Sequence, residues 1–189
     1  MKQGKLIIIS GPSGVGKKTI IDEIYPIKSL NLHPSISMTT RKPRINEVNG
    51  KDYFFISKEE FEKKIKNNEF LEYAIYNNNY YGTPKSFVID TLKKGHNVLL
   101  EIETDGVKKL LDENITSYKI FIAPPSIEAL RQRLLKRNTD SLTVINERIK
   151  KATEELELIE MYDVCIVNND LQTAINEVKN KIELILQND

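Results

Sequence analysis

Four short runs of nearly continuous hydrophobic residues recur along the chain. They are rich in isoleucine and valine: KLIIIS (5–10), NVLLEIE (97–103), YKIFIA (118–123) and YDVCIVN (162–168). Runs of this length without regular polar alternation are typical of strands that are buried on both faces of a parallel sheet. We therefore predict a parallel sheet that contains these four segments.

Two later segments have hydrophobic residues three and four positions apart, the spacing of one face of a helix. The first comprises Leu142, Ile145, Ile149, Ala152, Leu156 and Ile159, and the second Ile175, Val178, Ile182 and Ile185. Such amphipathic helices would cover the faces of the sheet. Strands that alternate with helices in this way predict a three-layer α/β core.

The segment 34–84 interrupts this alternation, because it is rich in tyrosine, asparagine and charged residues. It contains short strand-like pieces around one predicted helix, SKEEFEKKIKN (57–67), in which Ser57 and Glu60 have the spacing of a capping box. We interpret the segment as an α+β lobe inserted into the core.

Length and charge limit the classes of function. A chain of 189 residues with 40% hydrophobic residues can bury one sizeable core, and a net charge of +1 provides no general basic field for nucleic acid or an anionic membrane. The single cysteine, Cys165, cannot form an internal disulfide and is expected to be an inert core residue. The first hydrophobic run is too short for a signal peptide or a membrane span, so we expect a cytoplasmic protein.

The segment SGPSGVGKKT (10–19) carries the clearest chemical signal. Gly11, Gly16 and Lys17 match the phosphate-loop pattern G-x-x-x-x-G-K, although Lys18 stands where Ser or Thr is usual. A buried strand precedes the loop, and a helix that begins near Lys17 would direct the positive end of its dipole toward a bound anion. A glycine-rich turn without a ligand is the alternative, but the order of strand, loop and helix favours nucleotide binding.

A second group of basic and aromatic residues lies in the inserted lobe. Arg41 and Arg44 flank Pro43 in SISMTTRKPR (35–44), and the hydroxyl groups of Tyr53 and Tyr81 could add donors. Two arginines close together suit a phosphate group, because the guanidinium fork matches its oxygens. Taken alone, such arginines are more often a solvated surface; beside a phosphate loop, a second phosphate site is favoured.

The sequence resembles the guanylate kinase family, within the P-loop nucleoside monophosphate kinases, over nearly its whole length. The motifs that carry the resemblance are S-x-S-x-T-T-R-x-P-R (35–44), G-x-D-Y (50–53), E-F-[LI]-E (69–72), N-Y-Y-G (79–82) and V-N-x-D-L (167–171). The resemblance implies Mg²⁺-dependent transfer of a phosphoryl group from ATP to GMP, giving ADP and GDP.

The resemblance also implies an architecture. It predicts an α/β P-loop kinase fold with a five-stranded parallel sheet, whose fifth strand lies within HPSISM (33–38), and one domain made of three parts. These are a core of residues 1–33, 85–135 and 149–189, a GMP-binding lobe of residues 34–84 and a lid of residues 136–148. The expected partners are ATP and GMP, with dGMP use left open, and neither nucleic acid nor membrane; both a monomer and a homodimer fit.

Residue roles follow from the resemblance, position by position. Lys17, Arg41, Arg133, Arg137 and Arg148 would be catalytic. ATP would be bound by Gly11, Pro12, Ser13, Gly14, Val15, Gly16, Lys17, Lys18, Thr19 and Asn168, with Asn168 near the adenine. GMP would be bound by Ser37, Arg41, Arg44, Tyr53, Glu72, Tyr81, Thr83 and Glu103. The Mg²⁺ ion would be held by nucleotide phosphates near Thr19, without a direct protein ligand.

The guanine assignment agrees with elementary chemistry. The N1–H and 2-amino groups of guanine are adjacent donors, so a carboxylate such as Glu72 is the matching acceptor. Glu103 stands where the family usually has the shorter Asp. Asn46 and Asn138 replace family glycines, and asparagine tolerates left-handed backbone angles better than other non-glycine residues.

Two other functions fit parts of this pattern. A non-catalytic interaction module related to the family would have lost phosphate-loop residues, whereas this chain keeps Lys17. A kinase for another nucleotide, such as AMP, would have no use for Glu72, because adenine lacks both guanine donors. His33 and His96 lie outside any group with metal-ligand spacing and are not expected to be ligands or general bases.

Overall fold

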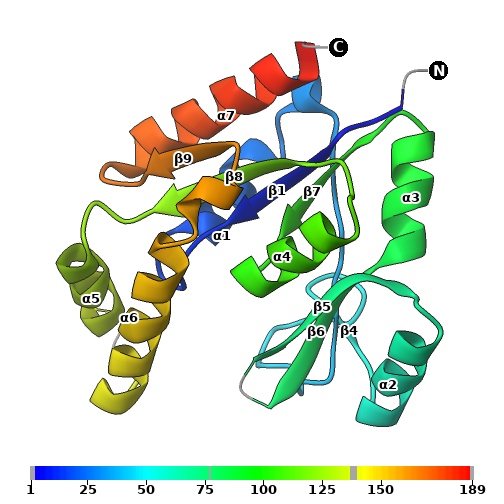
Figure 1. The fold of residues 1–189 in the computed structure, drawn as a ribbon, viewed down its shortest axis with the longest axis horizontal. Coiled ribbons are helices and arrows are strands. Elements are labelled where there is room, and N and C mark those ends of the chain that lie inside the picture. Colours follow the sequence, from blue (N-terminus) through cyan, green and yellow to red (C-terminus); the bar gives the residue numbers. More distant parts are fainter. Residues whose placement is uncertain (1–2, 77, 137–139, 188–189) are drawn as a thin grey trace.

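A five-stranded parallel sheet forms the centre of the computed structural model, which describes residues 3–76, 78–136 and 140–187 (Figure 1). The strand order is β2-β7-β1-β8-β9, and every neighbouring pair is parallel. The strands are β1 (Leu6–Ser10), β2 (Leu32–Pro34), β7 (Asn97–Glu101), β8 (Tyr118–Ala123) and β9 (Val164–Val167). The expected α/β class and the five-stranded parallel sheet are thereby confirmed.

The central strand β1 is buried on both faces, because alternate side chains of a strand point to opposite sides. Ile7 and Ile9 contribute to a hydrophobic cluster that includes residues of helices α1 and α7, whereas Leu6 and Ile8 contribute to another with residues of α3 and α4. The continuous hydrophobic run that marks β1 in the sequence therefore reflects a strand packed between two helical layers.

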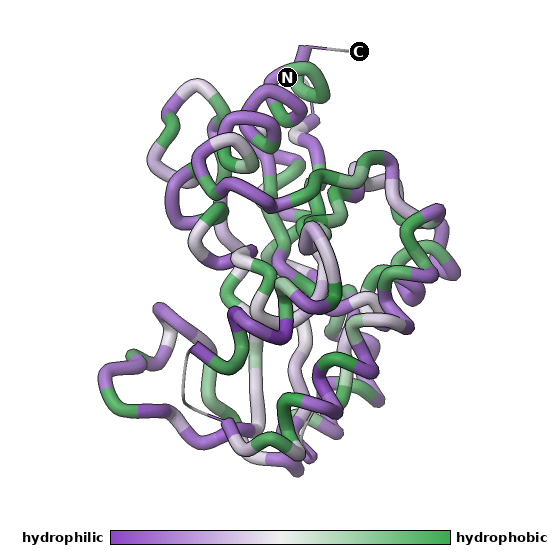
Figure 2. Tube along the Cα trace, turned by 90° about the vertical axis from the view of Figure 1, so that its left-hand side faces the viewer, coloured by the Kyte–Doolittle hydropathy of each residue, from purple (hydrophilic) through white to green (hydrophobic). Residues whose placement is uncertain are grey.

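Each helical layer comes from segments of the chain that alternate with the strands. The helices of the two layers are α1 (Lys17–Ile24), α7 (Leu171–Gln187), α3 (Lys85–Lys93) and α4 (Thr104–Asp112), and short 3₁₀ turns occupy Lys28–Leu30 and Ile159–Met161. Hydrophobic and hydrophilic residues alternate along these helices, as amphipathic packing on a sheet requires (Figure 2). The layers leave the carboxyl ends of the strands accessible.

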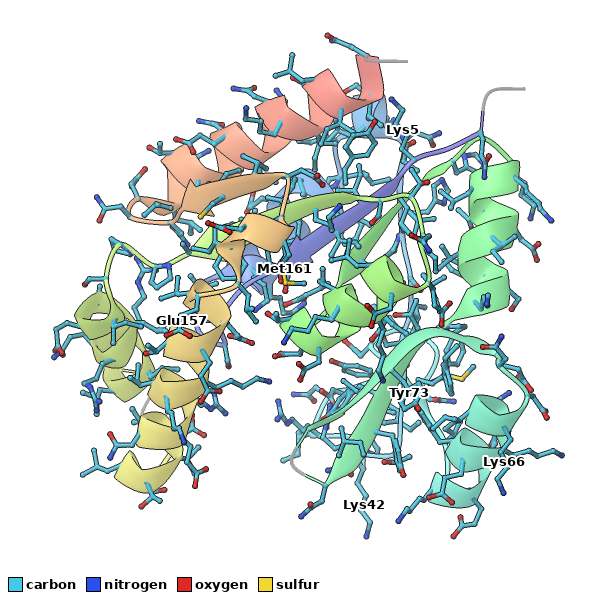
Figure 3. The ribbon with its side chains drawn as sticks, viewed as in Figure 1. Lys5, Lys42, Lys66, Tyr73, Glu157 and Met161 are labelled. Carbon is cyan, nitrogen blue, oxygen red and sulfur yellow. The ribbon has the colours of Figure 1, made fainter. Side chains whose placement is uncertain are left out.

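The predicted lobe, 34–84, contains a small sheet of its own, of order β4-β3-β6-β5, whereas its first residue, Pro34, pairs with Leu99 in the five-stranded sheet. Its elements are β3 (Met38–Thr39), β4 (Phe54–Phe55), α2 (Lys58–Lys66), β5 (Phe70–Tyr76) and β6 (Asn79–Pro84). The hydroxyl oxygen of Ser57 accepts from the backbone N–H of Glu60, as the capping pattern predicted. Lys109 of α4 donates to the carbonyl of Tyr73, which joins the lobe to the core (Figure 3).

Helices α5 (Ile127–Lys136) and α6 (Leu142–Leu156) pack against each other on the same side of the sheet as the lobe (Figure 1). They share a third hydrophobic cluster, made of Leu130, Leu134, Ile145, Ile149 and Ala152. Figure 3 shows Glu157 just beyond α6, where the chain returns toward the sheet. The predicted lid, 136–148, therefore includes the first half of α6.

Three local expectations differ from the structure. The strand expected within 33–38 is β2, which begins at Leu32 and ends at Pro34, and Met38 belongs to the sheet of the lobe instead. The helical pattern at 142–159 ends as an α-helix at Leu156. Cys165 is exposed, because its side chain alternates with the buried Ile166 on the outermost strand; the expectation of a core cysteine is wrong.

Candidate active site

The phosphate loop joins β1 to α1 at the carboxyl edge of the sheet. Gly16 adopts φ 106° at the N-cap of α1, in the left-handed region that favours glycine. At Gly11, which has φ +137°, a Cβ atom would lie 2.2 Å from the carbonyl oxygen of Ile122 on β8. The loop is therefore held tightly against the neighbouring strand, and both positions require glycine.

Two polar side chains support the loop from behind. The amide nitrogen of Asn168 donates to the carbonyl of Val15 at 2.8 Å, and Arg133 donates to the carbonyl of Asn168 at 2.7 Å. Asn168 is buried. The sequence predicts Asn168 near the adenine and Arg133 at the transferring phosphoryl group. The structure places both side chains against the backbone of the phosphate loop.

Lys17 is buried within the loop that it follows. Its ammonium group donates to the carbonyls of Gly11 at 2.5 Å and Pro12 at 3.1 Å. Lys18, in contrast, is exposed and pairs with Asp22 at 3.2 Å on the next turn of α1. Lys18 also lines the cavity at the phosphate loop, where a hydroxyl residue would otherwise stand.

Arg148 connects helix α6 to the phosphate loop. Its guanidinium group donates to the hydroxyl oxygen of Ser13 at 3.3 Å and lies 3.4 Å from the carboxylate of Asp140. Among the described residues, its Nε atom is buried without a hydrogen-bond partner. The lid arginine Arg148 is thus close to the loop, whereas the predicted Arg137 and Asn138 lie outside the described residues.

A cavity of about 320 Å³ separates the phosphate loop from the lobe. Its lining includes Lys17 and Lys18 of α1, five of the predicted GMP residues, and Glu101 at the end of β7. The five predicted residues are Ser37, Tyr53, Glu72, Tyr81 and Glu103. The structure therefore brings together, around one cavity, residues from segments far apart in the sequence.

Glu72 lies on β5, buried in the wall of this cavity. Its Oε1 atom accepts a hydrogen bond of 2.6 Å from the hydroxyl of Thr83, and burial raises the pKa of its carboxyl group. At Gly106 of α4 a Cβ atom would lie 2.6 Å from Oε2 of Glu72, so only glycine allows this approach. Thr83 is itself fully buried and acts on the cavity through Glu72.

The two lobe arginines are held differently from each other. The guanidinium group of Arg41 lies 2.9 Å from Oε1 of Glu47 and 5.5 Å from the centre of the Tyr53 ring, within range of a cation–π interaction. Arg44 is exposed, and its backbone N–H donates to Oε2 of the same Glu47. Glu47 therefore orders the turn that carries both arginines, and Asn46 within it has φ 71°, as expected for an asparagine that replaces glycine.

The structure contains no group of three or more histidine, cysteine or acidic side chains that could hold a metal ion, within the residues that it describes. The rings of His33 and His96 are tilted against each other with their centres 4.3 Å apart, and neither residue lines the cavity between the phosphate loop and the lobe. A second cavity, at the phosphate loop itself, is lined by Thr19 and Glu101, whose oxygens are suited to contact a hydrated cation.

Comparison with known proteins settles the family. The profile of the guanylate kinase family matches residues 3–184. This chain belongs to the guanylate kinase family. The guanylate kinase of Mycoplasmoides gallisepticum is 49% identical over 181 residues, which cover 96% of this chain and 93% of that protein. The guanylate kinase of Latilactobacillus sakei is 45% identical over 181 residues, covering 96% of this chain and 89% of that protein.

A solved structure agrees with this membership of the guanylate kinase family. The crystal structure of guanylate kinase from Anaplasma phagocytophilum superposes with a TM-score of 0.78 at 32% identity, covering 100% of this chain and 89% of that one. The P-loop kinase fold expected from the motifs is therefore confirmed.

Sequence reasoning missed four acidic or basic residues around the site of this guanylate kinase family member. Glu101 lines the cavity, and Glu47 pairs with Arg41. Lys151 and Glu155, both on α6, lie next to Glu103. Glu101 had a detectable signal, because it ends a buried strand next to the phosphate-loop strand. Desolvation within the cavity raises the pKa of Glu101, although Lys17 and Lys18 oppose this effect.

The carboxyl group of Glu155 provides a test of the electrostatics. Burial and the nearby carboxylate of Glu103 raise the pKa of Glu155 from the usual 4.5 to about 7 in the folded protein. Between these two values the unfolded chain is ionised while the folded protein keeps the proton. The stability of the wild type should therefore fall as pH rises through this window.

We predict that Glu155→Gln, which cannot ionise, removes this loss. The difference in melting temperature, variant minus wild type, should be larger at pH 7.5 than at pH 4.5. Thermal unfolding followed by circular dichroism at both pH values measures the difference. A difference that is the same at both values would show that Glu155 titrates as an ordinary surface carboxylate.

Proposed function

We propose that this chain is an ATP:GMP phosphotransferase whose two substrates meet in the cavity between the phosphate loop and the lobe. The observation that carries the proposal is that Lys17 of the phosphate loop and the buried carboxylate of Glu72 line one cavity. The first is a phosphate-binding cation, and the second matches the two adjacent donors of guanine. Membership of the guanylate kinase family supports the same activity.

The GMP base would lie against Glu72, which accepts from N1–H and the 2-amino group. Ser37 would face the O6 side, and Glu103 would accept from the 2-amino group. Thr83 would act indirectly, since its hydroxyl donates to Glu72 and keeps the carboxylate in place. The hydroxyl groups of Tyr53 and Tyr81, with Arg41 and Arg44, would bind the GMP phosphate. Arg41 would then exchange its contact with Glu47 for contacts with phosphate oxygens.

The phosphates of ATP would lie over the loop of residues 11–19. The backbone N–H groups of the loop and the amino end of α1 supply donors, which is sufficient for an anion although the net charge is only +1. Lys17 would release the carbonyls of Gly11 and Pro12 to follow the transferring group. Phosphoryl transfer depends mostly on positioning and on positive charge, so no nucleophilic side chain is required.

Magnesium would be bound chiefly by nucleotide phosphates, with Thr19 and Glu101 facing its water shell from the phosphate-loop cavity. Bound there, it would neutralise phosphate charge during transfer. Arg133 and Arg148 would position the loop and add positive charge next to it. Arg137 is assigned to the same lid by its sequence position.

The small hydrophobic cluster of α5 and α6 is distinct from the two clusters of the core. The lid of residues 136–148, whose Ile145 belongs to this cluster, and the lobe of residues 34–84 would close over the substrates, and closure would exclude water that could accept the phosphoryl group. No helix among the described residues is long and apolar enough to cross a membrane. We assign the activity to the cytoplasm, acting on free nucleotides as a monomer or a homodimer.

An AMP kinase is the second candidate, because it would use the same loop and lid. It is disfavoured by Glu72, whose buried carboxylate would face the N1 acceptor of adenine. A non-catalytic interaction module is disfavoured by the intact glycine and lysine positions of the loop.

The proposed activity predicts a defined pattern in a coupled assay of ADP production. The wild type should turn over with GMP and be far slower with AMP, because only GMP satisfies Glu72. Lys17→Met should keep the fold and lower kcat by ~10³-fold or more, the scale of loss when a phosphoryl-clamping cation is removed. Turnover without preference for GMP, or a folded Lys17→Met protein with normal kcat, would contradict the proposal.

Glu72→Gln isolates the recognition of guanine. Its amide oxygen can still accept from Thr83, which directs the NH₂ group toward the two donors of guanine. The loss of a charge-assisted pair should lower kcat/KM for GMP by about 3 kcal/mol, roughly a hundredfold, and leave AMP little affected. Kinetics with both nucleotides, alongside a melting curve as a folding control, decide the matter. An unchanged GMP to AMP ratio would remove Glu72 from the guanine site.

Closure predicts a smaller particle when both sites are filled. A bisubstrate analogue that links adenosine and guanosine through phosphates should reduce the radius of gyration measured by small-angle X-ray scattering. ATP alone serves as the control, because it fills only one of the two sites. A radius that does not shrink with the analogue would show that the lobe and lid do not close.

A further inference from the structure

Glu103 occupies the meeting point of three hollows in the molecular surface. It lines the cavity assigned to GMP, the cavity at the phosphate loop, and a smaller one beneath α6 that also touches Ser13 and Arg148. Glu103 lies two residues after β7 and is the N-cap of α4, so its backbone is fixed by the core. Its side chain has two methylene groups, which allow the carboxylate several orientations.

Lys151 reaches this carboxylate from α6. Its ammonium group donates to Oε2 of Glu103 at 3.0 Å and lies 4.0 Å from Oε1 of Glu155, one helical turn further along. Glu155 is buried, whereas Lys151 and Glu103 are each a little more than one-third exposed. Burial lowers the pKa of Lys151, but the two carboxylates more than offset this and the pKa is raised. One ammonium group therefore lies between the carboxyl groups of Glu103 and Glu155.

The same face of α6 also touches the phosphate loop. Arg148 lies one turn before Lys151 and donates to Ser13 at 3.3 Å. Helix α6 thus contacts the ATP side of the site through Arg148 and the GMP side through Lys151. An exposed salt bridge contributes little to stability. The main effect of the pair of Lys151 and Glu103 is therefore on the position of the Glu103 carboxylate.

We propose that Lys151 is a positioning residue that holds the carboxylate of Glu103 at the guanine edge of the GMP cavity, and thereby sets the preference for a base with a 2-amino group. This inference rests on the proposed function. A carboxylate has about four acceptor positions on its two oxygens, so it can accept from Lys151 and from an amino group together. Without Lys151, Glu103 loses the hydrogen bond that fixes its carboxylate in this orientation, and the side chain samples other rotamers.

IMP separates this role from a general effect on the lid, because its base keeps N1–H and O6 but lacks the 2-amino group. In Lys151→Met, kcat/KM for GMP should fall roughly tenfold, mainly through KM, with IMP unchanged. Lys151→Arg keeps the charge and should restore most of the preference. Lys150→Met, which changes an exposed lysine next in the chain, is the matched control and should behave like the wild type.

The Glu103→Gln background tests whether Lys151 acts through Glu103. If it does, the double variant Glu103→Gln/Lys151→Met should have the same ratio of kcat/KM for GMP to kcat/KM for IMP as the single variant Glu103→Gln. Equal losses for GMP and IMP in Lys151→Met, or no loss for either, would overturn the inference. Lys151→Gln, measured with a melting curve, replaces Lys151→Met should the latter fail to fold.

These outcomes are distinct from failure of the proposed function. A wild type that does not phosphorylate GMP would overturn the proposed function itself. A wild type that is active on GMP, with a GMP to IMP ratio insensitive to Lys151, would overturn only the role of Lys151.

Discussion

Binding of phosphate without a general excess of positive charge is the constraint on which the rest of the structure depends. With a net charge of +1, the protein must supply donors locally, from the backbone of residues 11–19 and the amino end of α1. Such a loop is useful only if it keeps its shape. Burial of β1 on both faces, the close contact of Gly11 with β8 and the hydrogen bond from Asn168 to Val15 all serve that end. The core of the protein is thus largely a support for one loop.

Carboxyl groups in and next to the cavity have the opposite character, because their burial weakens the fold. Burial raises the pKa values of Glu72 and Glu155, so ionising either in the folded protein costs free energy. Thr83 partly compensates Glu72 by donating to it. Lys151 donates to Glu103 and lies within ion-pair range of Glu155, 4.0 Å from its Oε1 atom. A buried acceptor that is held in one orientation binds a matching donor more selectively than a carboxylate exposed to water does.

Elements whose burial is continuous could be predicted from the sequence, whereas contacts between distant segments could not. The four hydrophobic runs are strands to within about two residues at each end. Burial on both faces accounts for the pattern of β1, whereas β9 at the edge of the sheet is buried on one face only. The small sheet of the lobe has strands as short as two residues, too short for any periodicity. The exposure of Cys165 follows from the position of β9 at the sheet edge, which local sequence does not encode.

The same distinction explains the candidate site. The family motifs pick out Lys17, Glu72 and Tyr81 along the chain, and the structure brings these three residues to one cavity, while their roles stay predictions. The pairing of Lys151 with Glu103 joins residues 48 positions apart and depends on how α6 docks against the end of β7. Arg148 on the same helix contacts Ser13, so a displacement of α6 would disturb both ends of the cavity together. A side chain outside every motif can therefore affect recognition of the base, provided that a rigid helix carries it to a motif residue.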